Sequence, residues 1–337
     1  MTARTTTSRV MAQYRYIGKY ASAVVCRGAL AAALTIVLIA TPTAALHAAA
    51  AGAGTSAAAA HLYWTNDGGV TVGRASLDGS QVNNRFVTGG VDPQRLCGVA
   101  IAGKYLYWGI DVPTGGPAIG RAKLDGTGVT VNFIPSGGDG PVCGVAVAGG
   151  HIYWASYANG DIGRANLDGT GVNHQFISGL ASVNGASYGC SVCDPNGLAI
   201  AGGYIYWGDA GSIGRAKLDG TGVNEHFITG LYFPVGVAVT SKYIYWTDQG
   251  GNFIGGPNHP SFIGRARLDG TAVQRGFIKG LDGACGVAIT DRYIFWAQNG
   301  LVGGKGTTLG RANLDGTSVQ PRFIAGLQAP CDVAVGP

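Results

Sequence analysis

Four cysteines recur at one equivalent position, immediately before a short apolar stretch that reads Gly/Asp-Val-Ala. They are Cys97, Cys143, Cys285 and Cys331. Thiols that recur in this way can pair as disulfides or, as four thiolates, hold Zn²⁺. Two further cysteines, Cys190 and Cys193, form a separate "CSVC" segment. No thioredoxin-like βαβ pattern surrounds that segment, so redox chemistry is not indicated there.

Disulfide formation is the chemistry that we expect of these six cysteines. Cys26 lies in the N-terminal segment described below, and the remaining six are an even number in an exported chain. We expect the neighbouring pairs Cys285–Cys331 and Cys97–Cys143. The two cysteines of "CSVC" then pair with each other, or one of them reaches Cys143. A thiolate metal site is the open alternative.

Groups that could perform acid–base or metal chemistry are few. Glu225 is the only glutamate, and it lies in a predicted outer strand beside His226. Neither a Ser-His-Asp order nor a His-Glu metal spacing is visible. We therefore expect no catalytic residue, no metal site and no cofactor. Calcium is the open alternative, with oxygen ligands from the predicted loops or central channel: Asp111, Asp194, Asp209, Asp248 and Asp332.

A repeated unit must position all of these residues. Six aromatic stretches end in Trp, and each is followed by "GRA.LDG" and then by a Phe; the tryptophans are Trp64, Trp108, Trp154, Trp207, Trp246 and Trp296. Each unit holds four short β-branched or aromatic stretches separated by Gly or Asp-Gly turns, without a sustained 3.6-residue periodicity. Such units, repeated about every 40–50 residues, predict an all-β fold: a six-bladed β-propeller of four-stranded antiparallel blades.

The repeated side chains of the unit are expected to be structural. The Tyr/Phe-Trp pairs occupy fixed strand positions, which favours packing between blades. Asp of "LDG" favours local hydrogen bonds in its turn, and Arg of "GRA" is expected to have a regular partner in its blade or the next. The Asp-Gly step predicts a type I′ turn, in which both central residues have positive φ.

The spacing distinguishes a constant face of the propeller from a variable face. Each inner-strand glycine precedes the next Trp by ten residues, and each "GRA" glycine precedes the next Phe by 13. From Trp to the "GRA" glycine the interval is instead 9, 12, 9, 7, 18 and 14 residues. The constant intervals contain the first and third turns of a blade, which lie at one end. All insertions therefore lie on the opposite face, where repeat proteins usually bind partners.

Three segments are predicted along the chain: a secretory signal peptide over residues 1–50, an Ala/Gly-rich linker over 51–60, and the propeller over 61–337. The N-terminal segment is basic and then apolar, and its densest apolar part is shorter than a membrane helix of about 20 residues. We expect a secreted, extracellular protein; an uncleaved N-terminal membrane anchor is the alternative. Residues 51–337 contain 18 basic and 18 acidic residues, so this part of the chain has no net positive charge that would attract nucleic acid.

The motif "YWTD", Tyr245 to Asp248, and the recurring "IGRA.LDGT" resemble the LDL-receptor class B, or YWTD, repeat. The resemblance covers roughly residues 61–337 and implies a six-bladed β-propeller, in a secreted single-domain version such as bacteria make. Only one unit spells the motif in full; the others read "YWTN", "YWGI", "YWAS", "YWGD" and "FWAQ". Propellers of this family mostly bind other proteins through varied surfaces, which implies binding rather than catalysis.

These observations predict a binding or scaffold module that recognises a protein or a cell-envelope glycan through its variable face. The expected ligand-binding residues are Asp111, Tyr157, Tyr188, Tyr232, Phe233, Phe253, His259 and Asn299. We expect a monomer, with membrane contact only if the N-terminal segment stays uncleaved. The alternative is an enzyme, lyase- or lactonase-like, with a metal at the mouth of the central channel near Asp332.

The final seven residues, "CDVAVGP", predict how the ring closes. They match the start of a unit, whereas the first aromatic stretch, "HLYW" at His61 to Trp64, has no such strand in front of it. We therefore expect residues 331–335 to join blade 1 as its innermost strand. One residue has no explanation from the sequence: Asp332 stands where the other units have Gly.

Overall fold

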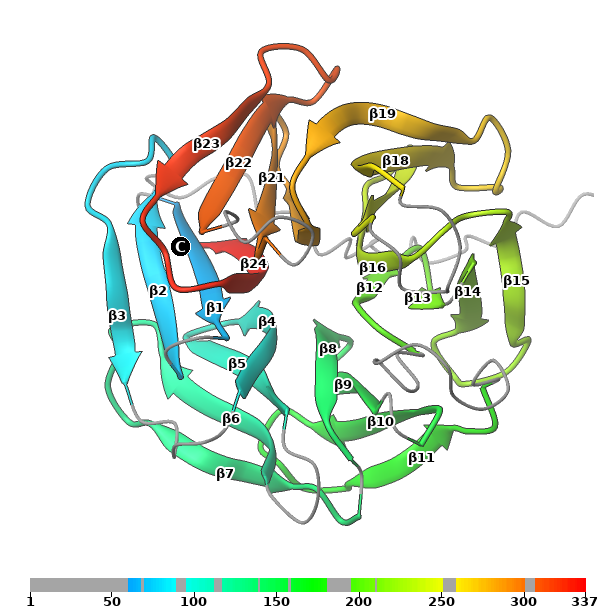
Figure 1. Cartoon of the computed structure of the whole chain (residues 1–337). Helices are drawn as coiled ribbons and strands as arrows, with labels where there is room; N and C mark the ends of the chain where they lie inside the picture. Colours follow the sequence, from blue (N-terminus) through cyan, green and yellow to red (C-terminus); the bar gives the residue numbers. More distant parts are fainter. Residues whose placement is uncertain are drawn as a thin grey trace, which may run out of the picture. The chain divides into compact units, whose positions relative to one another are not determined.

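The structure, a computed structural model, describes residues 60–67, 70–88, 95–111, 117–138, 140–156, 159–180, 195–209, 211–250, 259–300 and 307–337. All of them belong to one compact unit, residues 46–337. In this described part the chain forms six four-stranded sheets arranged in a ring, and every strand pair is antiparallel (Figure 1). The predicted all-β, six-bladed propeller is confirmed.

Each sheet is one blade, and its strands follow chain order outward from the axis, with blade 1 as the exception. Blade 1 contains β24(Pro330–Gly336), β1(His61–Asn66), β2(Thr71–Ser76) and β3(Asn83–Thr88). Blade 2 contains β4(Arg95–Ala102), β5(Tyr105–Asp111), β6(Pro117–Lys123) and β7(Thr130–Pro135). Blade 3 contains β8(Val142–Ala148), β9(His151–Ser156), β10(Asp161–Asn166) and β11(Asn173–Ile177). Blade 4 contains β12(Leu198–Ala201), β13(Tyr204–Asp209), β14(Ser212–Lys217) and β15(Asn224–Thr229). Blade 5 contains β16(Pro234–Val239), β17(Tyr243–Asp248), β18(Ser261–Arg267) and β19(Gln274–Leu281). Blade 6 contains β20(Ala284–Ile289), β21(Tyr293–Gln298), β22(Thr308–Asn313) and β23(Gln320–Ala325).

The C-terminal strand closes the ring. β24 pairs with β1, and Figure 1 shows the two ends of the described chain side by side in one blade. The register places Trp64 opposite Val333, and the Tyr63 hydroxyl donates to the Pro337 carbonyl at 2.8 Å. The predicted closure of the ring by residues 331–335 is therefore confirmed, and β1 is paired on both of its edges.

A tryptophan and a glycine face each other across the second and third strands of every blade. Trp64 pairs with Gly73 in β1 and β2, and the other five "GRA" glycines pair with their tryptophans in the same way. A Cβ atom on any of these glycines would overlap the indole ring. All six tryptophans are at most 1% exposed. The absence of a side chain at Gly is thus what lets the indole lie flat on the sheet.

The hydrophobic core lies between neighbouring blades. Trp154 of blade 3, for example, packs in one buried cluster with Tyr107 and Ile119 of blade 2. At the outer rim, Phe133 of blade 2 contacts Gly169 of blade 3, and the other five outer-strand phenylalanines contact the "LDG" glycine of the next blade equivalently. The arginines of "GRA" lie over the same phenylalanine rings at 3.8–4.2 Å, which confirms their predicted partners within the blade.

The repeated Asp-Gly turn differs from the predicted type I′ turn. Gly79 has φ 85°, whereas Asp78 is not among the described residues with positive φ. The Gly79 N–H donates to the Ser76 carbonyl, so the central residues are Leu77 and Asp78. The Asp78 carboxylate accepts from the Ser80 N–H and hydroxyl, which lower its pKa. The other five aspartates bond equivalently, so their predicted structural role is confirmed.

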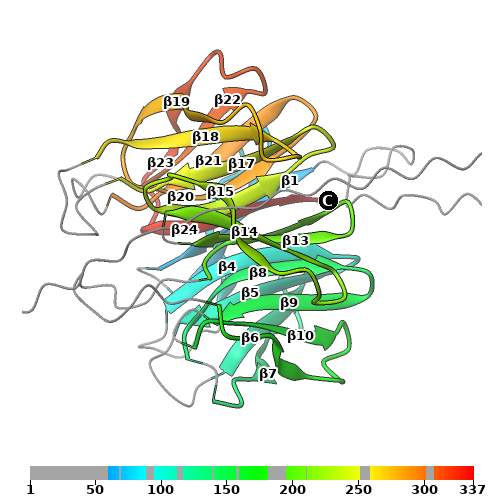
Figure 2. The same ribbon diagram turned by 90° about the vertical axis from the view of Figure 1, so that its right-hand side faces the viewer.

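The strands of each blade run between the two faces of the ring, as the side view in Figure 2 shows. The constant face carries the tight turns, including the six "LDG" turns. The opposite, variable face carries the connections that differ in length. In blade 5 that connection covers residues 249–260, whereas in blade 4 it is only residues 210–211.

We predict that deletion of residues 331–337 strongly destabilises the protein. The deletion removes β24, including the buried Val333, and leaves β1 with an unpaired edge. We expect a loss of more than about 4 kcal/mol in the free energy of unfolding, measured by chemical denaturation. Deletion of Pro337 alone is the control and should cost about 1 kcal/mol, the value of one hydrogen bond. An unchanged denaturation midpoint for the longer deletion would contradict the closure.

We predict that Gly163→Ala lowers stability by about 1–3 kcal/mol, because the new methyl group displaces the Trp154 indole from a packed interface. The matched control is Gly276→Ala in β19, where a Cβ meets only the flexible side chain of Lys279. The control should change the free energy of unfolding by less than about 1 kcal/mol. If both substitutions lowered the free energy of unfolding equally in urea denaturation, the contact between Gly163 and the Trp154 indole would not explain the loss.

Candidate functional site

The four recurring cysteines lie where the innermost strands begin, on the variable face. We call Cys285, Cys331, Cys97 and Cys143, in this order around the axis, the cysteine row. Their strands are neighbours, since β24 contacts both β20 and β4, and β4 contacts β8. Four consecutive blades, 6, 1, 2 and 3, therefore each contribute one sulfur atom.

Each cysteine of the row sits at a β-bulge. In β8, Cys143 and Gly144 together oppose the single residue Ala155 of β9. The register shifts in the same way in β24, at Cys331 and Asp332, and also in β4 and β20. A bulge leaves an extra residue unpaired and turns its side chain away from the regular pleat. In the sequence, the only indication of these bulges is the constant position of Cys before the inner strand.

Threonine side chains satisfy the backbone at one of these bulges and at the equivalent bulge of β16 in blade 5. The Asp332 N–H donates to Thr65 Oγ1 at 3.2 Å, and the Gly236 N–H donates to Thr247 Oγ1 at 2.8 Å. The Thr247 hydroxyl in turn donates to the Cys285 carbonyl of the next blade. The third residue of "YWTD" thus has a physical role, because a buried N–H without a partner is costly.

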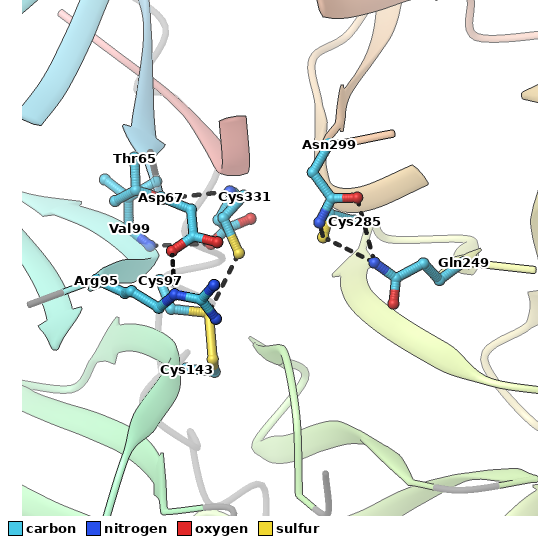
Figure 3. Close-up of a disulfide and its surroundings, with 11 residues drawn as sticks. Thr65, Asp67, Arg95, Cys97, Val99, Cys143, Gln249, Cys285, Asn299 and Cys331 are labelled. Carbon is cyan, nitrogen blue, oxygen red and sulfur yellow. Dashed lines mark hydrogen bonds and ion pairs between the residues drawn. A yellow bond between two sulfur atoms is a disulfide. The ribbon is translucent and has the colours of Figure 1, made fainter. Parts of the chain in front are cut away.

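Cys97 and Cys143 form a disulfide, with their Cα atoms 4.6 Å apart. This pair agrees with the sequence-based expectation. The expected partner pair, Cys285–Cys331, is not bonded, and both residues are free thiols. The reason lies in where the Cys331 side chain points, because its Sγ lies 3.3 Å from Cys97 Sγ (Figure 3). Cys331 therefore faces the disulfide of the neighbouring blades.

The free thiol of Cys331 is in an environment that opposes ionisation. A hydrogen bond with the Cys285 thiol and burial together hold the pKa of Cys331 well above its usual range. The negative charges of Asp67 and Asp332 act in the same direction. Cys331 is thus protonated at neutral pH.

Cys285, at the other end of the row, receives hydrogen bonds from two amide side chains. Asn299 Nδ2 donates to Cys285 Sγ at 3.0 Å, and Gln249 Nε2 does so at 3.6 Å. The two amides are also bonded to each other, with Gln249 Nε2 donating to Asn299 Oδ1 at 3.3 Å (Figure 3). Asn299 was predicted to bind a ligand, and in the structure it lies beside the cysteine row.

An ion pair flanks the row on the solvent side. Arg95 Nε lies 3.2 Å from Asp67 Oδ1, with the two side chains 65% and 27% exposed (Figure 3). Solvent screens such a pair, so its contribution to stability is small. The ion pair instead shows that the connection after β1 lies against the start of β4, next to Cys97.

Asp332, unexplained by the sequence, links blade 1 to blade 2. Its Oδ2 accepts from the Val99 N–H of β4 at 2.9 Å, and its Oδ1 accepts from the Val333 N–H at 2.8 Å. The carboxyl is half-buried, and its burial raises its pKa to about 6 despite these two hydrogen bonds. The acid thus provides a connection between blades that a glycine could not.

Tyr232 and His259, predicted to bind a ligand, lie together on the variable face. Their ring centroids are 3.5 Å apart, and both residues are half-buried. Phe233, in contrast, is only 7% exposed, so its predicted contact with a ligand is corrected: its ring is part of the interior. Tyr232 is half-buried and Phe233 is buried, and aromatic character alone could not distinguish the two.

The remaining predicted ligand-binding residues fall outside what the structure describes. Tyr157, Tyr188 and Phe253 lie outside the described residues, and so do Cys190 and Cys193. Asp111 is the last residue of β5, but its side chain is not described. These predictions therefore stay predictions.

Besides Asp332, two more of the aspartates considered for calcium bond to the protein itself. Asp248 accepts hydrogen bonds from the N–H groups of Tyr232, Phe233 and Gly250. Burial raises its pKa, while these three N–H groups and the charge of His259 oppose the shift. Asp209 is 3.5 Å from the Ser212 hydroxyl. Among the described residues, no group of three or more His, Cys, Asp or Glu is arranged to hold a metal ion.

The described part of the chain also contains no helix long and apolar enough to cross a membrane. This finding concerns only the residues given above, and it leaves the expectation for residues 1–50 untested.

Comparisons with known proteins support the fold. No protein-family model matches the sequence, and no curated protein matches it. Among solved structures, a chain in the crystal structure of the nidogen/laminin complex is similar, with a TM-score of 0.59 and 18% identity over 82% of this chain and 98% of that one. The computationally designed Ika8 protein is less similar, with a TM-score of 0.46 and 10% identity over 80% and 73% of the two chains. The first likeness supports the resemblance to YWTD propellers at the level of the fold.

We predict that the Asp332 carboxyl makes stability depend on pH. Its pKa in the folded state, about 6, exceeds the ordinary value of 3.8 for an aspartate, so the stability that it contributes is present below about pH 4 and is lost as pH rises through 6. The loss is at most about 3 kcal/mol, because partial exposure weakens the effect of burial. Asp332→Asn should remove this pH dependence.

The measurement is chemical denaturation of the protein and of Asp332→Asn at several pH values between 4 and 7. The difference between their free energies of unfolding should shift in favour of Asp332→Asn as pH rises. A difference that is constant over this range would show that Asp332 titrates normally.

Proposed function

We propose that this protein is a secreted binding or scaffold module that recognises a protein or cell-envelope glycan partner through its variable face. One observation carries the proposal: the connections of varied length all lie on one face, while the other face repeats the same turn six times. A fixed scaffold that presents varied connections at one end is the usual arrangement of a recognition surface.

Two further observations support a binding role. Two carboxylates that could act as acids or bases, Asp332 at the cysteine row and Asp248 in blade 5, accept hydrogen bonds from the chain's own backbone. In addition, the similar solved propeller comes from a complex of two proteins, nidogen and laminin. Secretion, a signal peptide over residues 1–50 and a monomeric state are parts of the same proposal.

Within the variable face, we propose the surface around Tyr232 and His259 as the first contact region. The two rings meet where the connection between blades 4 and 5 touches the long connection of blade 5. Aromatic groups such as these two rings suit both protein and glycan surfaces.

We predict that shortening the blade 5 connection abolishes partner binding without unfolding the protein. The variant replaces residues 249–260 with Ala-Gly, the two residues that connect the corresponding strands of blade 4. The probe is the detergent-solubilised envelope fraction of the producing cell, with binding followed by surface plasmon resonance. Protease treatment or periodate oxidation of the probe distinguishes a protein partner from a glycan.

The matched control alters the constant face instead. Val172→Ser, Val223→Ser and Val273→Ser change three side chains that are 37%, 43% and 38% exposed in the repeated turns. We expect the control to bind as the parent protein does, whereas the shortened variant loses at least tenfold in affinity. Loss of binding in the control, with full binding by the shortened variant, would place the recognition surface on the constant face and contradict the proposal.

A further inference from the structure

The cysteine row contains a free thiol in contact with a disulfide. Cys331 Sγ lies 3.3 Å from Cys97 Sγ, which is bonded to Cys143. Reacting atoms that are held about 3–3.5 Å apart are in the range of a near-attack arrangement. Figure 3 shows Cys331 on the side of Cys97 that faces away from Cys143, the side from which a thiolate displaces a sulfur atom.

We propose that the cysteine row is a thiol–disulfide exchange site in which Cys331 attacks Cys97 and displaces Cys143. The Cys331 thiolate forms a new bond with Cys97 Sγ, and the Cys97–Cys143 bond breaks. Cys143 leaves as a thiolate and takes up the proton that Cys331 lost. One disulfide is consumed and one is formed, so the step needs neither an oxidant nor a reductant.

The exchange moves the covalent link to a different place in the ring. Before it, the link joins β4 to β8; after it, the link joins β24 to β4 and ties the C-terminal strand to blade 2. The sequence separation of the linked cysteines increases from 46 to 234. In the chain-entropy account, a link that closes a longer loop restricts the unfolded chain more. The exchanged form therefore holds the ring closure covalently.

The surroundings of Cys331 keep the exchange slow at neutral pH. The groups that face its thiol from the adjoining elements are Cys97 of β4, Cys285 of β20, Asp67 after β1 with its partner Arg95, and Asp332 of its own strand. The Cys285 hydrogen bond, burial and the two carboxylates raise the pKa of Cys331. Because only the thiolate attacks, the exchange should accelerate as pH rises beyond the usual range of a thiol.

The test maps disulfides in the full chain after incubation without oxygen or added thiol, at pH 7 and at pH 9.5. Acid quenching and alkylation with N-ethylmaleimide fix the pairing, and non-reducing tryptic digestion followed by mass spectrometry reports it. Trypsin places the four cysteines of the row on four separate peptides, because it cleaves after Arg95, Lys104, Lys123, Arg164, Lys279, Arg292 and Arg322. Cys190 and Cys193 share a fifth peptide and cannot be confused with these.

At pH 7 we expect the Cys97–Cys143 link. At pH 9.5 we expect a Cys97–Cys331 link together with alkylated Cys143. The control is Cys331→Ser, in which Cys143 should be alkylated at least tenfold more slowly at pH 9.5. A second variant, Cys143→Ser, should form the Cys97–Cys331 link on oxidation with oxidised glutathione, and its melting temperature should then fall on reduction.

Three results would overturn the proposal. The first is protection of Cys143 from alkylation at both pH values in the parent protein. The second is equally fast alkylation of Cys143 in Cys331→Ser. The third is a Cys285–Cys331 link formed beside an intact Cys97–Cys143 link and unchanged at pH 9.5, which would make the row two structural disulfides. Circular dichroism of each variant shows that its propeller is folded.

Discussion

The propeller depends on the contact between a tryptophan indole and the glycine opposite it, made once in each blade. The ring lies on its own sheet where the glycine has no side chain, and its other face packs against the preceding blade. Each large aromatic side chain buries about 150–250 Å² and contributes to the interface that joins two blades. The same contact therefore sets both the packing within a sheet and the spacing between sheets.

The innermost strands meet a second constraint, because six of them must approach one another around the axis. Bulges at their first residues turn the cysteines toward the neighbouring blade, and glycines there leave room for its backbone. At the closing strand Asp332 replaces glycine, and its carboxylate reaches across to Val99. Blade 1 is thus joined to blade 2 by a polar contact, whereas glycines at the equivalent positions of other blades allow close backbone packing.

Several features of the site could be predicted from spacing, and others could not. The constant position of Cys before four of the six inner strands predicted a cluster on one face, and the Cys97–Cys143 bond agrees with it. The free thiols of Cys285 and Cys331 depend on which way each bulge turns a side chain, and residue type does not encode that direction. Phe233 illustrates the same limit, because an aromatic residue in a connection can face either the interior or the solvent.

The sequence by itself determined the all-β repeat, the number of blades, the strand that closes the ring and the face that carries the insertions. These follow from local patterns and from intervals counted along the chain, which short-range turns and strand pairing impose. Only the tertiary structure decided the turn type at Asp78, the role of Asp332 and the contact of Cys331 with Cys97. The turn type depends on backbone φ angles, and the other two depend on distances between atoms of blades brought together by folding; no interval along the chain encodes either quantity.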